Sequence, residues 1–292
     1  MKWPGFAWSV AIATLTVAHG ASAAPSSTPA VDDTAAAPAP PPPPAPRAPG
    51  RAYQLSWGID LPVIAIGTVM MTARGMRDQA SGPPAYCLTT PQGCDKNRLL
   101  FIDRPFAGRY DKNWNTFSDA GAVTMGLAPL VLLGADGRVV DGLNDAVVIY
   151  ESGLLASALS SLSTLSTERA RPFVYGTKAP RSVRYGPDGA LSYFSGHASF
   201  AFAMAMSTFW TVKRRHPHSA YPWVVLGVGL GAATAVATAR VMAGKHFPTD
   251  VLAGAAVGAS LGTLVPFLHN APVQLSGTAS AHETLIDAYG RF

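Results

Sequence analysis

Residues 240–254 read RVMAGKHFPTDVLAG and join two apolar segments of helical length. One segment, roughly residues 223–242, precedes the junction, and the other, residues 249–268, follows it. Pro248 suits the first position of a helix, where its missing N–H costs nothing. The junction therefore predicts that one helix ends, a short polar loop follows, and a second helix begins at Pro248.

Four further apolar segments of helical length precede this pair, at residues 61–73, 120–133, 143–165 and 196–212. The turns between them contain Gly, Pro and polar residues, as connections between helices do. Alternating Val/Ile-rich strands are few, and no strand–helix–strand rhythm is present. The sequence therefore predicts an all-α fold, a bundle of six helices.

Small residues recur at every fourth position in the last two segments. Glycines are spaced in this way at 227 and 231, and again at 254, 258 and 262. A spacing of four places them on one helix face, where two backbones can approach closely. We therefore expect both helices to pack through these glycine faces.

Composition limits the classes of function that are open to the chain. Of its 292 residues, 48% are apolar and only 13% are charged, against an average of about 25% charged residues. Disorder requires low hydrophobicity and high charge, so a disordered protein is excluded. The net charge of +5 is scattered, and no basic helix with interleaved aromatics is present, which argues against a nucleic-acid partner. Low charge instead favours membrane association.

The first 50 residues are expected to form no part of the helical domain. Residues 1–23 resemble a secretory signal peptide, with Lys2, an apolar run over residues 6–17 and a small-x-small site ending at Ala23. A retained membrane anchor is the alternative. Residues 24–50 hold ten of the 25 prolines and predict an extended, disordered Ala/Pro-rich linker.

The helical domain is expected over residues 51–270, followed by a tail, residues 271–292, for which the sequence offers no interpretation. The chain has two cysteines, Cys87 and Cys94. In an oxidising compartment they are expected to form a disulfide. Metal binding is the weaker interpretation, because no histidine lies near them in sequence.

Three short stretches concentrate residues that can handle a phosphate group. They are Arg169-Ala-Arg-Pro172, Phe194-Ser-Gly-His197, and Arg240 together with residues 244–250. Ser195 is a good N-cap and would place Gly196 and His197 in the first turn of a helix. The unpaired N–H groups and the positive dipole end of that turn favour an anion.

The third stretch adds a candidate nucleophile. Asp250 follows His246 by four residues and is expected to hydrogen-bond its imidazole, leaving the other ring nitrogen as a nucleophile. Arg171 and Arg240 offer planar guanidinium groups that match phosphate oxygens. Each residue taken alone also has a structural explanation, as a helix-terminal or ion-pairing group. The remaining histidines, His269 among them, are expected to be surface or loop residues.

The order Arg-Pro, Ser-Gly-His, Arg-x5-His-x3-Asp over residues 171–250 resembles the type 2 phosphatidic acid phosphatase superfamily. That superfamily includes bacterial class A acid phosphatases and vanadium haloperoxidases. The resemblance implies that His246 forms a phosphohistidine, that Asp250 orients it, and that His197 protonates the leaving alcohol and then activates water. It also implies phosphate contacts from a set of four residues: Arg171, Arg240, Ser195 and Gly196.

This sequence departs from the family pattern at one charged position. The family's first motif begins with a lysine seven residues before the arginine of Arg-Pro, and here that residue is Thr164. Arg169 or Lys178 could supply the missing charge. Phe194 stands where proline is usual.

The resemblance implies a metal-independent phosphatase that acts on phosphomonoesters, with lipid phosphate or lipid pyrophosphate favoured. It requires no cofactor and no metal. One alternative is a haloperoxidase that holds vanadate in the same site, and another is a degenerate bundle that binds phosphate groups or acts as a membrane scaffold. The substrate and the oligomeric state stay open.

The expected location is outside the cytoplasm, in the periplasm or on the periplasmic face of the membrane. The positive-inside rule places residues 213–215 (Lys-Arg-Arg) in the cytoplasm and the phosphate-handling stretches outside. If the three segments before Arg171 all cross the membrane, the domain begins on the cytoplasmic side. A cleaved signal peptide would instead place the beginning of the domain outside the cytoplasm. Either one early segment does not span, or the bundle is water-soluble. Asp145 and Glu151 would not be tolerated on a lipid-facing surface.

Overall fold

A computed structural model describes residues 51–78, 87, 94–136, 139–269, 274–279 and 284–289. The chain divides into two units, residues 1–43 and 44–292, and every described residue lies in the second. The expected signal peptide, residues 1–23, and the expected linker, residues 24–50, lie outside the described residues.

Six long helices form the domain: α1 (Trp57–Asp78), α3 (Lys112–Ala135), α4 (Val139–Thr167), α6 (Gly196–Arg215), α7 (Tyr221–Met242) and α8 (Pro248–Leu268). Each apolar segment predicted from the sequence lies within one of them, so the all-α prediction is confirmed. Short helices connect them: η1 (Lys96–Arg98), η2 (Arg104–Phe106), η3 (Pro172–Tyr175), α5 (Arg181–Arg184) and η4 (Pro187–Ala190).

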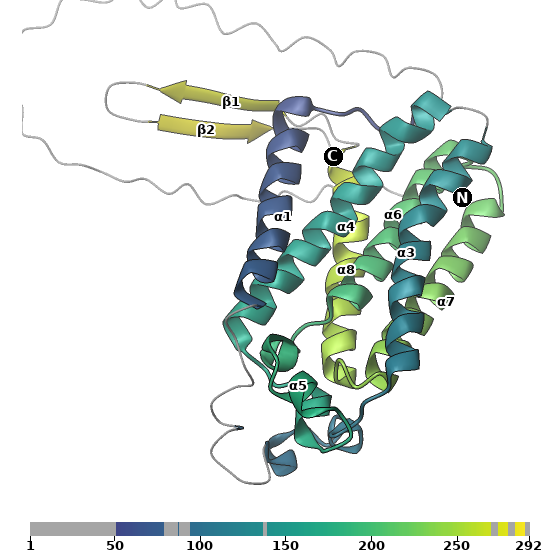
Figure 1. Ribbon diagram of the computed structural model, residues 1–292. Helices are drawn as coiled ribbons and strands as arrows, with labels where there is room; N and C mark the ends of the chain where they lie inside the picture. Colours follow the sequence, from purple (N-terminus) through teal and green to yellow (C-terminus); the bar gives the residue numbers. More distant parts are fainter. Residues whose placement is uncertain are drawn as a thin grey trace, which may run out of the picture. The chain divides into compact units, whose positions relative to one another are not determined.

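Helix α6 lies at the centre of the bundle and packs against α3, α4, α7 and α8. Figure 1 shows α1 at one edge of the bundle, beside α4, with which it makes its main contacts. The tail adds an antiparallel hairpin of β1 (Gln274–Ala279) and β2 (Thr284–Tyr289), with Gln274 opposite Tyr289. The sequence analysis did not predict this hairpin.

The glycines of α8 allow a close approach to α6. A Cβ atom added at any of the three would lie 2.1–2.6 Å from a backbone carbonyl oxygen of α6 or its N-cap; the glycines are Gly254, Gly258 and Gly262. The prediction for α8 is confirmed. It is wrong for α7, because Gly227 and Gly231 are exposed and a Cβ there would meet no described atom within 4 Å.

The bundle has two ends, which we name from their connections. The α5 end comprises residues 94–111, 168–195 and 243–247, and the α6–α7 end comprises residues 51–56, 213–220 and 269. Helix α1 begins at the α6–α7 end, because the backbone N–H groups of Ala52 and Tyr53 bond the carboxylate of Asp145, which also pairs with Arg215. The first described residue and the end of α8 therefore lie at the same end of the bundle.

The α5 end is packed around a disulfide. Cys87 and Cys94 are bonded to each other. Both are buried in an apolar cluster with Phe173 and Phe247. The disulfide thus lies beneath the loops that carry the phosphate-handling stretches.

Four helices, α3, α4, α7 and α8, are long and apolar enough to cross a membrane. Their outer surfaces expose large apolar side chains such as Val131, Val228 and Leu252, each more than 60% exposed. Asp145 and Glu151, which the sequence analysis treated as unfavourable in a span, are buried inside the protein. Helix α4 can therefore face lipid with its other side, and these features indicate association with a membrane.

Candidate active site

The three stretches predicted from the sequence meet at the α5 end. Arg171 precedes η3, Ser195 is the N-cap of α6, Arg240 lies in the last turn of α7, and His246 lies in the loop between α7 and α8. The side chains of Ser195, Arg171, Arg240 and His246 are all at least 95% buried.

The loop that carries His246 depends on Gly244. This residue has φ +72°, and a Cβ atom there would lie 1.9 Å from the carbonyl oxygen of Arg109. The Gly244 carbonyl also accepts a hydrogen bond from the backbone N–H of Phe173, at 3.2 Å. Only glycine allows both the left-handed conformation and this close approach, so the loop is fixed against η3.

The hydrogen bonds of His246 determine its tautomer. Nδ1 lies 2.7 Å from the carbonyl oxygen of Ser192, and because a carbonyl can only accept, Nδ1 carries the proton. Nε2 is left with a lone pair, 3.4 Å from Nη1 of Arg171. Burial, together with Arg171 and Arg240, lowers the pKa of His246 well below 6.5. The imidazole is therefore neutral near pH 7 and has the nucleophilic nitrogen on the side of the cations.

Asp250 does not contact His246 as the sequence predicted. Its carboxylate accepts hydrogen bonds from Ser192 Oγ at 2.6 Å and from the Phe247 backbone N–H at 2.8 Å, and it pairs with Arg169. Within the described chain it makes no hydrogen bond to the imidazole, so that prediction is wrong. Asp250 is the third residue of α8 and turns back to bond the N-cap backbone, as acidic residues there do. It supports His246 through Ser192 instead.

The residues proposed to replace the family lysine are occupied elsewhere. Arg169 bonds Asp103 at 2.7 Å in addition to Asp250, and its guanidinium lies over the Phe247 ring, so it supports the start of α8. Lys178 is exposed. Thr164 is buried and bonds the Ser161 carbonyl, at 2.9 Å.

A lysine that the sequence analysis overlooked lies beside Arg171. Lys245 Nζ lies 2.9 Å from Asp188 Oδ2, and the other oxygen of Asp188 lies 2.7 Å from Nη2 of Arg171. Arg171 Nη1 also donates to the Lys245 carbonyl at 2.9 Å. Asp188 therefore holds two cations next to His246, and its position in a turn gave no sequence signal.

Helix α3 supplies a second group that the sequence analysis missed. Arg240 Nη1 donates to Asn115 Oδ1, Ser118 Oγ and Asp119 Oδ1 at 3.0–3.2 Å. The same Asp119 oxygen lies 2.9 Å from Nε2 of His197. One carboxylate thus contacts both Arg240 and His197. The spacing of Asn115, Ser118 and Asp119 at i, i+3 and i+4 places them on one face at the start of α3, and this is the signal that could have found them.

The N-terminus of α6 is built as predicted. The Ser195 hydroxyl accepts a hydrogen bond from the backbone N–H of Ala198, at 3.4 Å. The Gly196 N–H lies in the first turn, where the helix dipole attracts an anion. The site therefore combines a neutral imidazole, two arginines, a lysine and a helix N-terminus. Such a set can stabilise the charge of a phosphoryl group.

Two comparisons with known proteins found a similarity. Residues 146–272 match the family model of the PAP2 superfamily. Among solved structures, a crystal structure of a transmembrane PAP2-type phosphatidylglycerolphosphate phosphatase from Bacillus subtilis matches at 21% identity, over 72% of this chain and 96% of that one, with a TM-score of 0.41. No match was found among curated protein sequences. Residues 146–272, which match the PAP2 superfamily model, hold every catalytic and phosphate-binding residue predicted from the sequence.

Proposed function

We propose that the protein is a metal-independent phosphatase that hydrolyses phosphomonoesters through a phosphohistidine on His246. The observation that carries this proposal is the tautomer of His246, because the Ser192 carbonyl fixes the proton on Nδ1 and leaves Nε2 beside Arg171. Phosphoryl transfer requires mainly positioning and charge stabilisation, and the buried cations supply both.

In the first step, Nε2 of His246 attacks phosphorus and forms an N–P bond while the P–O bond to the alcohol breaks. The leaving oxygen takes a proton from His197. In the second step a water molecule gives a proton to His197 and attacks phosphorus, the N–P bond breaks, and inorganic phosphate leaves. Asp119 orients His197 through a contact with its Nε2.

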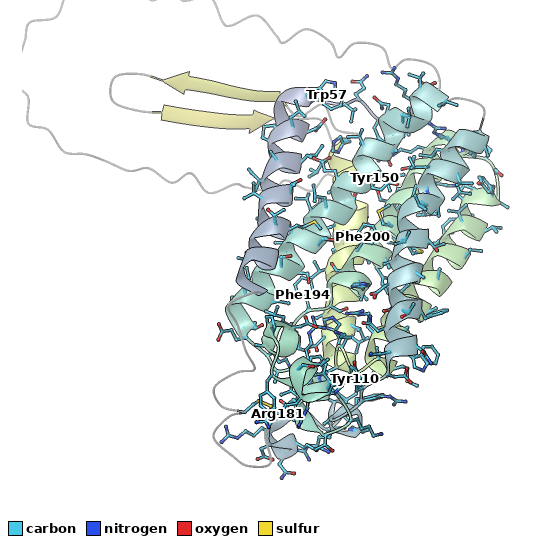
Figure 2. The ribbon with its side chains drawn as sticks, in the orientation of Figure 1. Trp57, Tyr110, Tyr150, Arg181, Phe194 and Phe200 are labelled. Carbon is cyan, nitrogen blue, oxygen red and sulfur yellow. A yellow bond between two sulfur atoms is a disulfide. The ribbon has the colours of Figure 1, made fainter. Side chains whose placement is uncertain are left out.

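A cavity of about 550 Å³ supports a lipid substrate. It lies among α1, α3, α4 and α6, and Gly196 and His197 are part of its wall. Most of the remaining wall is apolar, including Ile64, Leu154 and Phe200. Tyr150 and Phe200, labelled in Figure 2, lie in the middle of the bundle between the two ends. A hydrocarbon chain bound there would have its phosphate group beside the catalytic histidines.

The proposed location of the active site is the non-cytoplasmic side of a membrane. The positive-inside rule does not decide which end of the bundle faces the cytoplasm, because both ends carry positive charge. Lys96, Arg98 and Arg104 lie at the α5 end, and residues 213–215 lie at the α6–α7 end. The disulfide supports the proposal, because such bonds persist in oxidising compartments. If all six helices span, residue 51 lies on the cytoplasmic side, which is incompatible with a cleaved signal peptide at residues 1–23.

Thiol labelling tests this orientation, since both native cysteines are bonded to each other. Ser182, at the α5 end, and His218, at the α6–α7 end, are both exposed. In intact cells a membrane-impermeant thiol reagent is expected to label Ser182→Cys, and to label His218→Cys only after lysis. The reverse pattern would place the active site in the cytoplasm and would agree with a cleaved signal peptide.

The catalytic proposal is tested by hydrolysis of p-nitrophenyl phosphate and of phosphatidic acid with EDTA present. His246→Ala is expected to lose at least ~10⁴-fold in rate, since removing the nucleophile of a catalytic set removes most of its effect. A phosphohistidine trapped by acid quench in the wild type and missing in the variant would identify the intermediate. No phosphate release from folded wild-type protein would instead favour the vanadate or non-catalytic alternative.

A further inference from the structure

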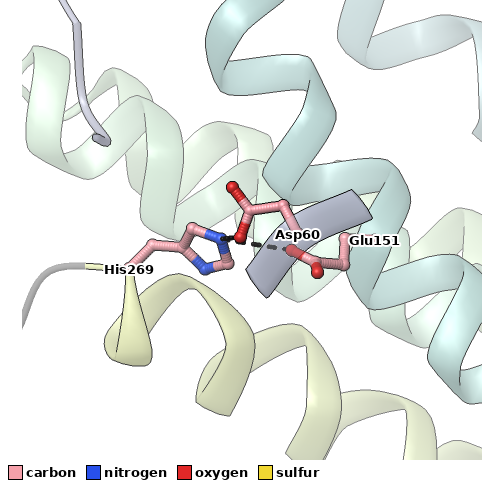
Figure 3. Close-up of side chains that lie close together, drawn as sticks. All are labelled: Asp60, Glu151 and His269. Atoms are coloured by element: carbon pink, nitrogen blue, oxygen red, sulfur yellow. Dashed lines mark hydrogen bonds and ion pairs between the residues drawn. The ribbon is translucent and has the colours of Figure 1, made fainter. Parts of the chain in front are cut away.

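A second group of ionisable side chains lies toward the α6–α7 end, and the proposed reaction does not use it. It consists of Asp60 in the first turn of α1, Glu151 in α4 and His269 at the end of α8 (Figure 3). Asp60 and Glu151 are 2% and 3% exposed. His269, expected on the surface, has a side chain only 11% exposed. Because α8 rises about 1.5 Å per residue, His269 lies roughly 28 Å along the helix from Asp250.

Three ligand atoms converge in this cluster. Nε2 of His269 lies 3.2 Å from Asp60 Oδ1 and 3.2 Å from Glu151 Oε2. Nδ1 of His269 lies 2.9 Å from the Val265 carbonyl and must donate to it. In the neutral imidazole, Nε2 therefore presents a lone pair to two carboxylate oxygens. With Nε2 unprotonated, these three electron-rich atoms would repel one another, and either a cation between them or a proton on Nε2 would remove the repulsion.

Glu151 provides an independent observation. Its Oε2 is buried and accepts no hydrogen bond within the described part of the chain. A buried carboxylate oxygen without a hydrogen bond carries a substantial desolvation cost. The atom lies 3.2 Å from Nε2 of His269, and a dashed line in Figure 3 marks this ion pair. A ligand that Oε2 could coordinate would remove that cost.

We propose that Asp60, Glu151 and His269 bind a zinc ion that joins α1, α4 and α8. Zinc accepts His nitrogen and carboxylate oxygen at about 2.0–2.2 Å in a tetrahedron, so its ligand atoms lie roughly 3.3 Å apart. The two measured separations of 3.2 Å fit this geometry. A water molecule would complete the coordination.

The outer contacts of the cluster also fit a metal site. A histidine that binds a metal usually donates its other ring N–H to a carbonyl or carboxylate, as His269 does to Val265. The second oxygen of Asp60 accepts a hydrogen bond from the Ser56 backbone N–H, at 2.8 Å. Because α1 makes its main contacts with α4 alone, a zinc ion here would fix α1 to the rest of the bundle.

Zinc binding to the full-length protein in detergent tests the proposal. The protein is stripped with a chelator, dialysed against zinc and analysed for metal content. Wild type and His218→Ala, an exposed histidine at the same end, are expected to bind one zinc per chain and to gain thermal stability. Glu151→Gln, which preserves the shape, is expected to bind at least tenfold more weakly. Equal zinc content in wild type and Glu151→Gln would overturn the proposal and leave a protonated His269 as the cation.

Cobalt(II) gives a second readout on the wild type alone, in case Glu151→Gln does not fold. The proposal predicts the intense visible bands of tetrahedral cobalt, which zinc displaces, and octahedral cobalt or no binding would contradict it. Zinc is expected to leave the rate of p-nitrophenyl phosphate hydrolysis unchanged, because this ester has no hydrocarbon chain to fill the cavity that Glu151 also lines. A negative metal result is therefore distinguishable from failure of the proposed phosphatase activity.

Discussion

The two ends of the bundle bury charge in opposite ways. At the α5 end, buried cations of Arg171 and Arg240 lie near a neutral imidazole, an arrangement that favours an incoming anion. At the α6–α7 end, buried carboxylates take backbone N–H groups, Arg215 and His269 as partners. The difference shows that the two ends suit different partners: the buried cations of the α5 end suit an anion, and the buried carboxylates of the other end join segments of the chain.

The largest expected effect is a loss of stability at the α6–α7 end. Asp145 is fully buried and bonds Ala52, Tyr53 and Arg215. Asp145→Asn is expected to lower the free energy of unfolding by about 3 kcal/mol, because it breaks a buried ion pair. Thermal unfolding in detergent measures the effect, and activity at low temperature should persist.

Asp141 gives a matched control on the same helix. It pairs with Arg51 at a partly exposed position, so Asp141→Asn is expected to cost less than ~1 kcal/mol. If Asp145→Asn abolished phosphate release in a protein that remained folded, the separation between the two ends would be disproved.

The next largest expected effect is a loss of activity at the α5 end. Asp119→Asn removes the carboxylate that links His197 to Arg240, and we expect kcat/KM to fall by about 10²-fold. Thermal stability should change little, because the Asp119 side chain is half exposed. Thr116→Ala, which removes an exposed hydroxyl of α3 that bonds only its own helix, is the control. Equal rates for Asp119→Asn and wild type would remove Asp119 from the mechanism.

The smallest effect concerns the cavity between the two ends. Ala122 contributes to the cavity wall, whereas its neighbour Val123 is 62% exposed on the outer surface. Ala122→Trp is expected to lower kcat/KM for long-chain phosphatidic acid by about tenfold, since the ring occupies the space for a hydrocarbon chain. Hydrolysis of p-nitrophenyl phosphate should be unchanged. Val123→Trp should affect neither substrate, and a similar loss from both variants would contradict a chain-binding cavity.

The sequence by itself determined the features that depend on residues close in the chain. Helical segments, the Ser195 cap, the start of α8 at Pro248 and the glycine face of α8 all follow from local spacing, and the structure has each of them. The order of the three stretches also resembles the superfamily whose model matches residues 146–272. These features could be predicted because helix periodicity and capping act over a few residues.

Only the tertiary structure decided which groups share a site. Asp119 meets His197 across 78 residues, and His269 meets Asp60 across 209. The observed partner of Asp250 differs from the predicted one for the same reason. Ser192 comes from a different segment of the chain and lies between Asp250 and His246. Such contacts depend on the rotation and axial shift of packed helices. A rotation of one residue, about 100°, turns a side chain away from its partner, and local sequence does not specify that rotation.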